Sequence, residues 1–495
     1  MDLIMKKTFA LGLVFVLLLS CLPLNAAAQE AATAPIIIVN GMSAVPLLGG
    51  EGGNTPGENL FPSVPSIILT VLKLLPALIH SLVTRDMHVL GEALSRHLLP
   101  MFDGWLCNPD GTSKNPVTVK QYPKSYADDP AVTEDGVGNG FSRAELAQAI
   151  GAENVYSYAS DWRLDIMADA VQLHEYIENV KADRGAQKVT LVSVSMGGAI
   201  TLAYLQQYGY DSVCRLGFLS STHNGTYFIS DFFTGRTDVN ADVFAAVMTN
   251  LTAEIPLVGT LVGGLMRLGK DSGALTGMMA GFNAATAEIS EVTNANLLLP
   301  FLGYMPSAWS MIPPQDYAAA KEFMLDETLH AELIAKIDNY YNNVGSRTAE
   351  ILAEAEAHGI PLFFTSHYGI GPLLPIGESA LTQSDSIADT RGTSGGAVCA
   401  VPGTALGSDY AQQNSACGHN HLSADGILDA SAALYPEYTW FVKNMSHTDY
   451  GKAPESMEFL IWLICAEGQV TVTSNPRFPQ FNQLDATAGK FSPLV

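Results

Sequence analysis

The chain has 495 residues, of which 48% are hydrophobic and 15% are charged, and its formal net charge at pH 7 is −24. This composition is typical of a globular protein with a large core, built either as one unit with insertions or as several domains. The strong negative charge disfavours binding to nucleic acids and to anionic surfaces.

The N-terminal segment has the features of an export signal. Lys6 and Lys7 precede an apolar stretch over residues 9–24, and a run of alanines ends at Ala28. The apolar stretch is short for a membrane span and small residues follow it, so we expect cleavage after Ala28 and a secreted, extracytoplasmic chain. The alternative is cleavage before Cys21, whose lipidation would anchor the chain to a membrane.

Downstream, short runs rich in Ile, Val, Leu and Phe alternate with longer helical patterns. The runs predict strands at Pro35–Asn40, Glu153–Tyr158, Lys188–Val194, Arg215–Ser220, Pro361–Ser366 and Tyr438–Lys443. The helical patterns cover Asp165–Asp183, Gly198–Tyr208, Glu327–Tyr341, Arg347–His358 and Glu455–Ala466. This alternation predicts an α/β fold with a mainly parallel central sheet and helices on both faces.

One segment interrupts the alternation. Residues 226–314 are rich in Gly, Ala, Met and Leu and carry little charge, so we expect a helical cap over the carboxyl edge of the sheet. A separate small helical domain is the alternative. The expected organisation is a signal peptide (1–28), a first core part (29–225), the cap or lid (226–314) and a second core part (315–495).

The stretch KVTLVSVSMGGAI places two serines at the end of a predicted strand, directly before a helix. A strand that ends sharply at a serine and continues into a helix is typical of a nucleophile elbow. The residues two before and two after the nucleophile pack closely and must be small. Ser195 satisfies this with Ser193 and Gly197, whereas Ser193 as nucleophile would place Leu191 in the tight turn. The pattern therefore favours Ser195, and Ser193 replaces the usual glycine. An ordinary turn in which a serine caps the helix is the simpler alternative.

A serine nucleophile needs a base and an acid that orients the base, and in this fold the chain order is Ser, acid, His. His447 follows the last predicted strand and lies after both other groups. Asp425, in an Asp-Gly turn, is the predicted acid, and Asp429 in the same region is the runner-up. An Asp-Gly pair is also an ordinary turn signal.

The oxyanion that forms on the attacked carbonyl needs two backbone N–H donors. We expect one from Met196, directly after the nucleophile, and one from Met42 in the loop after the first strand. This chemistry requires no metal and no cofactor.

A cysteine-rich and histidine-rich stretch, residues 417–421, reads CGHNH. Three soft ligands in five residues without a distant fourth ligand are a weak metal signal, so no metal site is predicted. Cys399 and Cys417 could form a disulfide in an exported protein. Asp161-Trp162-Arg163 is interpreted as a structural turn.

Taken together, the motifs resemble the lecithin:cholesterol acyltransferase-like branch of the α/β-hydrolases, which includes lipases, phospholipases and acyltransferases. The matching motifs, in chain order, are PIIIVNGMSAVPL, VYSYASDWRLD, VSMGG, SSTHNGTYFISDFFTG, GYMPSAWSMIPP, ADGILDAS and MSHTDY. The resemblance implies an α/β-hydrolase fold with Ser195 as nucleophile, Asp425 as acid and His447 as base. It also implies oxyanion donors near Met42 and Met196.

This chain departs from the family pattern at two places: Ser193-Val194 stands where Gly-His is more usual, and Leu428-Asp429 where Val-Pro or similar is usual. We expect an exported serine hydrolase that cleaves esters of apolar acyl chains, with lipid-surface contact through the cap. The alternatives are a lipid O-acyltransferase with the same triad, and a catalytically silent lipid- or partner-binding protein.

Overall fold

The computed structural model describes residues 34–53, 56–84, 86, 88–129, 142–252, 256–288, 294–372 and 376–495. The predicted export signal, including Cys21, lies outside the described residues. Among the described helices, none combines the length and the apolar character that a membrane crossing requires.

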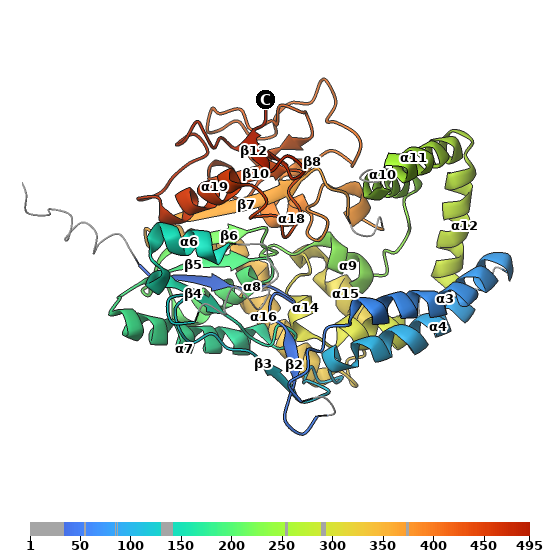
Figure 1. The fold of residues 1–495 in the computed structure, drawn as a ribbon, viewed down its shortest axis with the longest axis horizontal. Coiled ribbons are helices and arrows are strands. Elements are labelled where there is room, and N and C mark those ends of the chain that lie inside the picture. Colours follow the sequence, from blue (N-terminus) through green and yellow to red (C-terminus); the bar gives the residue numbers. More distant parts are fainter. Residues whose placement is uncertain are drawn as a thin grey trace, which may run out of the picture.

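The centre of the protein is an eight-stranded sheet with the order β12-β11-β10-β7-β6-β5-β1-β4 (Figure 1). All neighbouring strands are parallel except β11 and β12. The strands are β1 (Ile36–Val39), β4 (Val155–Tyr158), β5 (Val189–Val194), β6 (Val213–Leu219), β7 (Leu362–Tyr368), β10 (Thr439–Lys443), β11 (Phe481–Asp485) and β12 (Lys490–Pro493). All six predicted strands are present, and β11 and β12 were not predicted.

The strands are apolar on both sides because each side faces a separate core. Ile37 and Val39 of β1 belong to one buried cluster, and Ile36 and Ile38 belong to another. Successive side chains of a strand point to opposite faces, so continuous apolar runs are expected where helices cover both faces. The predicted α/β fold with a mainly parallel sheet is confirmed.

The first face is covered by α7, α8, α16 and α17, and the second by α6 and α19 (Figure 1). Their bounds are α6 (Arg143–Ile150), α7 (Ile166–Arg184), α8 (Gly197–Tyr208), α16 (Ala331–Asn343), α17 (Thr348–Ala357) and α19 (Pro454–Cys465). The five predicted helices correspond to α7, α8, α16, α17 and α19.

Helix α7 shows why these boundaries could be predicted. The Asp165 side chain accepts a hydrogen bond from the Met167 amide and caps the first turn, while Gly185 ends the helix at φ 62°. Between them, Leu173 and Ile177 point into the core at a four-residue spacing.

Two groups of helices extend from the α/β body to one side (Figure 1). The first, not predicted, lies between β2 (Leu47–Gly49) and β3 (Val117–Val119) and contains α3 (Val64–Thr84), α4 (His88–Leu98) and η1 (Leu99–Trp105). The second lies within the predicted cap segment and contains α10 (Ala241–Thr252), α11 (Pro256–Asp271) and α12 (Ala274–Glu288). The same segment also contains α9 (Tyr227–Phe233), η3 (Asn294–Gly303) and α14 (Pro306–Trp309), and α9 and α14 pack against the α/β body. Helices α15 (Tyr317–Met324) and α18 (Thr390–Ser394) lie closer to the sheet.

Candidate functional site

Ser195 occupies the sharp turn between β5 and α8. Its φ angle is 55°, in the left-handed region that non-glycine residues rarely adopt. The Ser195 amide donates to the Leu219 carbonyl (3.1 Å) and the Ser195 carbonyl accepts from the Thr222 amide (3.1 Å), so β6 and its following loop hold the turn. A serine in this conformation at a strand-to-helix turn is the geometry of a nucleophile elbow.

Glycines allow the neighbouring chain to approach this turn. A Cβ on Gly197 would collide with the Val39 carbonyl oxygen, and a Cβ on Gly198 would collide with the Ser221 hydroxyl. A Cβ on Gly41, at the end of β1, would lie 2.7 Å from the Ser195 Cβ. The helix side of the turn and the loop after β1 therefore both require glycine for close packing.

Ser193, which stands where a glycine is usual, is accommodated by a specific contact. Its side chain is fully buried, and its Oγ lies 2.7 Å from the Thr201 Oγ1 on α8. The hydroxymethyl group therefore points away from the turn and pairs with the following helix. Ser193 leaves the turn intact and is not itself a candidate nucleophile.

The two predicted oxyanion donors, Met42 and Met196, belong to segments that approach each other closely. Gly41 precedes Met42, and a Cβ on Gly41 would lie 3.1 Å from the Met196 amide nitrogen. Asn40 fixes the end of β1, because its side-chain amide donates to the Tyr158 carbonyl (2.6 Å) and its Oδ1 accepts from the buried Arg143 guanidinium (3.0 Å). This network holds the loop of Met42 beside the elbow.

The imidazole of His447, in the loop after β10, pairs with Asp385. His447 Nδ1 lies 2.6 Å from Asp385 Oδ2, and the His447 amide donates to the Asp385 carbonyl (2.9 Å). The other carboxylate oxygen of Asp385 accepts from the amides of Ile387 (3.0 Å) and Ala388 (2.7 Å). The carboxylate is therefore held in position from both sides and presents one oxygen to the ring.

In this buried pair, attraction between the imidazolium and the carboxylate outweighs the effect of burial on both pKa values. Burial alone would lower the pKa of His447, but the Asp385 carboxylate raises it above the ordinary value through its charge and hydrogen bond. Burial alone would raise the pKa of Asp385, but His447, His367 and the Ala388 amide together lower it. Asp385 is thus a stable anion that favours the protonated form of His447.

The structure corrects the assignment of the acid. Asp425 does not contact His447: its Oδ2 pairs with Lys443 Nζ (2.9 Å), and its Oδ1 accepts from the Ser423 hydroxyl (2.6 Å). Asp429, the runner-up, is buried and accepts from the Tyr410 hydroxyl (2.9 Å). Both carboxylates stabilise the long segment between β7 and β10.

One sequence signal could have found Asp385. Asp385 lies 17 positions after the last residue of β7 (385 − 368), whereas Asp425 lies 57 positions after it (425 − 368). The sequence prediction depends on an Asp-Gly turn, and the stretch around Asp385 has no glycine. Nearness in sequence to the carboxyl end of β7 therefore identifies the acid better than an Asp-Gly turn does.

Ser195 and the His447–Asp385 pair lie at the same edge of the sheet, where the parallel strands end. The loop after β10 folds back over β7 and β6: the Tyr450 ring contacts the His367 ring (centroids 5.0 Å), and His367 Nδ1 lies 3.1 Å from the Ser220 hydroxyl. Ser220 follows β6, the strand that pairs with β5. The loop of His447 thereby reaches the strand next to the elbow.

Two further sequence predictions concern the turn at Asp161–Arg163 and a disulfide between Cys399 and Cys417. Arg163 is fully buried and pairs with Asp161 through Nε (2.8 Å) and a terminal nitrogen (2.6 Å), as expected for a structural turn. Cys399 and Cys417 are both free thiols, so the disulfide considered for them is not formed.

Comparisons with known proteins add little. No family model matches the chain, and no curated protein matches it in sequence. Among solved structures it is similar to a chain in "The crystal structure of Tle4-Tli4 complex", at 11% identity over 87% of this chain and 98% of that chain, with a TM-score of 0.33. A likeness of this size carries no argument, so functional inference depends on the sequence and the site geometry.

Proposed function

We propose that the protein is a serine hydrolase that cleaves carboxylic esters of apolar acyl chains through an acyl-enzyme on Ser195. The observation that carries this proposal is the pairing of His447 with Asp385 at the sheet edge where Ser195 occupies a strained elbow. A turn disrupted by Ser193 would support a catalytically silent binding protein, whereas Ser193 pairs with Thr201 and Ser195 keeps the elbow conformation.

In the proposed reaction, Ser195 Oγ attacks the ester carbonyl while His447 Nε2 accepts the hydroxyl proton. Asp385 accepts the Nδ1 proton of His447, which leaves Nε2 as the basic nitrogen, and it stabilises the imidazolium. The amides of Met42 and Met196 stabilise the oxyanion. His447 then protonates the leaving alcohol, and water releases the acyl group by the same steps.

Exposed leucines support an apolar ester as the substrate. On α3, Leu69, Leu72 and Leu75 are exposed at three-residue steps, and on α11 Leu261 and Leu265 are exposed one turn apart. Exposed apolar patches of this kind are typical of surfaces that contact lipids or other apolar partners. We propose that these helices, together with the rest of the 226–314 segment as a lid, contact a lipid aggregate.

The resemblance to the lecithin:cholesterol acyltransferase-like branch supports the same substrate class. Transfer of the acyl group to a bound alcohol would use the same acyl-enzyme and differs only in the acceptor. We propose hydrolysis, with water as the acceptor of the acyl group. The predicted signal over residues 1–28 supports an extracytoplasmic location, with lipidation of Cys21 as the alternative.

A fluorophosphonate probe tests the proposal directly, since it forms a covalent bond with an activated serine. We expect saturable labelling of the purified protein and its loss in Ser195→Ala. Ser193→Ala is the matched control, because Ser193 lies two residues away and faces Thr201. Absence of labelling in the folded wild-type protein, or equal labelling of Ser195→Ala, would refute the proposal.

A further inference from the structure

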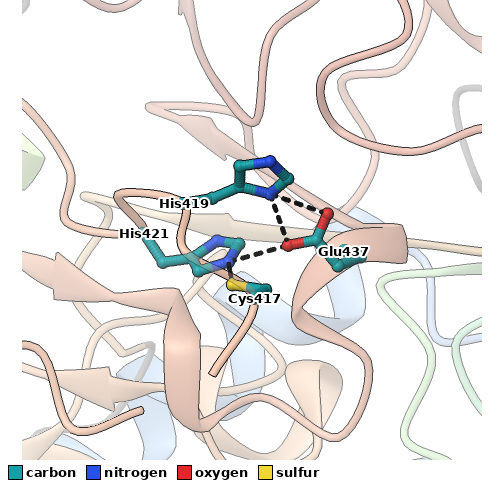
Figure 2. A group of neighbouring side chains, drawn as sticks. All are labelled: Cys417, His419, His421 and Glu437. Carbon is teal, nitrogen blue, oxygen red and sulfur yellow. Dashed lines mark hydrogen bonds and ion pairs between the residues drawn. The ribbon is translucent and has the colours of Figure 1, made fainter. Parts of the chain in front are cut away.

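Four potential metal ligands meet at one point outside the proposed active site (Figure 2). Cys417, His419 and His421 come from one loop, and Glu437 comes from the short helix η8 (Pro436–Tyr438). One ligand atom from each residue lies within 4.8 Å of the other three. Glu437 is the distant fourth ligand whose absence argued against a metal site in the sequence.

The contacts within this cluster are short. His421 Nε2 lies 3.0 Å from Cys417 Sγ and 3.0 Å from Glu437 Oε1, and His419 Nδ1 lies 2.9 Å from the same carboxylate oxygen. In a tetrahedral zinc site, bonds of about 2.0–2.3 Å place neighbouring ligand atoms roughly 3.3–3.8 Å apart. Small side-chain movements would therefore complete such a site.

Gln480 selects the tautomer of the neutral His421 ring. The Gln480 amide nitrogen donates to the carbonyls of Pro436 (2.7 Å) and Thr439 (3.2 Å), so its Oε1 must face His421 Nδ1, 2.7 Å away. Nδ1 then carries the proton, and the lone pair of Nε2 points at the thiol and the carboxylate. A histidine ligand whose other nitrogen donates to a fixed acceptor is the usual arrangement around a protein-bound metal.

The chemistry of the four donors indicates which cation fits. A thiolate, two imidazoles and one carboxylate form a mixed S, N and O set that suits Zn²⁺ and not Ca²⁺ or Mg²⁺, which prefer oxygen ligands. With four protein ligands no position remains for a substrate or a catalytic water, as in structural zinc sites.

The cluster lies at the opposite end of β10 from the proposed active site. Glu437 precedes β10 and His447 follows it, so the strand separates them by on the order of 16 Å. The loop is braced internally, since Gln412 accepts from the His421 amide (2.7 Å) and donates to the His419 carbonyl (3.0 Å), and its contact with Gln480 joins it to the segment before β11. A metal would add an attachment to the residues just before β10, through Glu437.

We propose that Cys417, His419, His421 and Glu437 bind a structural Zn²⁺ ion that fastens the loop over residues 400–422 to the sheet. This site is independent of the proposed hydrolase activity. Binding requires the Cys417 thiol to lose its proton to solvent, after which the thiolate coordinates the metal.

Metal content and cobalt spectroscopy test the proposal on the full chain. We expect one equivalent of Zn²⁺ in protein purified without chelator, and a thiolate-to-metal charge-transfer band when Co²⁺ replaces it. Both should be lost in Cys417→Ser and retained in Cys465→Ser, a matched control because Cys465 is also an exposed free thiol. Retention of the metal or the band in Cys417→Ser would overturn the proposal.

Stability and thiol reactivity provide readouts that are separate from activity. Zn²⁺ should raise the melting temperature of the wild type and, in the Cys465→Ser background, should protect Cys417 from a thiol reagent until a chelator is added. His419→Ala should weaken Zn²⁺ affinity at least about tenfold; its side chain is 45% exposed, so this variant should fold even if His421→Ala does not. A melting temperature and thiol reactivity unchanged by Zn²⁺ would overturn the proposal, whereas fluorophosphonate labelling of Ser195 should be independent of Zn²⁺.

Discussion

His447 Nδ1 and Asp385 Oδ2 lie 2.6 Å apart although 62 residues separate them in the chain. Asp385 is an anion that also accepts hydrogen bonds from two backbone amides, so it has no proton to donate to the ring. His447 Nδ1 must therefore be the protonated nitrogen of the neutral ring. The basic nitrogen of His447 is therefore Nε2. This tautomer is the one that a serine base requires.

The first prediction separates the two candidate acids. Asp385→Asn should lower kcat for a soluble chromogenic ester by about 10⁴-fold, because the amide can hold the ring in the wrong tautomer. The measurement is the steady-state rate, with circular dichroism to verify folding.

Asp425→Asn is the matched control for this substitution. It removes an ion pair with the partly buried Lys443, so it should lower the free energy of unfolding by about 1–2 kcal/mol and leave kcat close to wild type. The reverse pattern, with Asp425→Asn inactive and Asp385→Asn active, would restore the acid assignment made from the sequence.

The second prediction concerns pH. The neutral form of His447 is the base, so kcat/KM should fall as pH decreases through the pKa of His447, which Asp385 raises above the ordinary value of 6.5. In Asp385→Asn the attraction is lost and burial dominates, so the acid limb of the residual activity should move to lower pH. A limb that stays in place or moves to higher pH would contradict the proposed pairing.

The contrast between Asp385 and Asp425 shows where sequence reasoning ends. The Asp425-Gly426 pair is indeed a turn: Gly426 has φ 67°, and Asp425 Oδ1 accepts from the Ile427 amide. The local pattern predicted the local structure correctly. Which carboxylate reaches His447 depends on how two long loops fold over the sheet edge, and no local pattern specifies that.

Elements whose residues contact near neighbours in the chain were predictable, and tertiary contacts were not. Buried strands such as β5 and amphipathic helices such as α7 were predictable, because their apolar spacing reflects burial within a few residues. Helix α3 was not predicted, because its exposed leucines obscure the usual two-faced pattern. The role of Glu437 was missed because its approach to His421 is a tertiary contact.

The third prediction tests the lipid-surface proposal. Leu72 and Leu265 are each 55% exposed, so replacing them with Ser should not disturb the core. We expect the double variant to lose activity toward esters in phospholipid vesicles while keeping wild-type kcat/KM for a short soluble ester. Co-sedimentation with vesicles should fall in parallel.

Val171→Ser, on α7, is a control, since Val171 is exposed on a helix outside this surface. Equal losses on both substrates would argue against lipid contact.

The fourth prediction concerns the turn around Ser195 and compares substitutions at Gly197 and Ser193. Gly197→Ala would place a methyl group against the Val39 carbonyl oxygen, a backbone atom that cannot move without shifting β1. Overpacking of this kind costs typically about 1–3 kcal/mol, and here the shift would also displace Met42 from Ser195. We therefore expect both a lower melting temperature and a loss of fluorophosphonate labelling.

Ser193→Gly is the matched control. It loses only the hydrogen bond to Thr201 and some strand rigidity, together about 1–2 kcal/mol, and should keep its labelling rate. If Ser193→Gly abolished labelling while Gly197→Ala did not, the elbow would not be organised around Ser195.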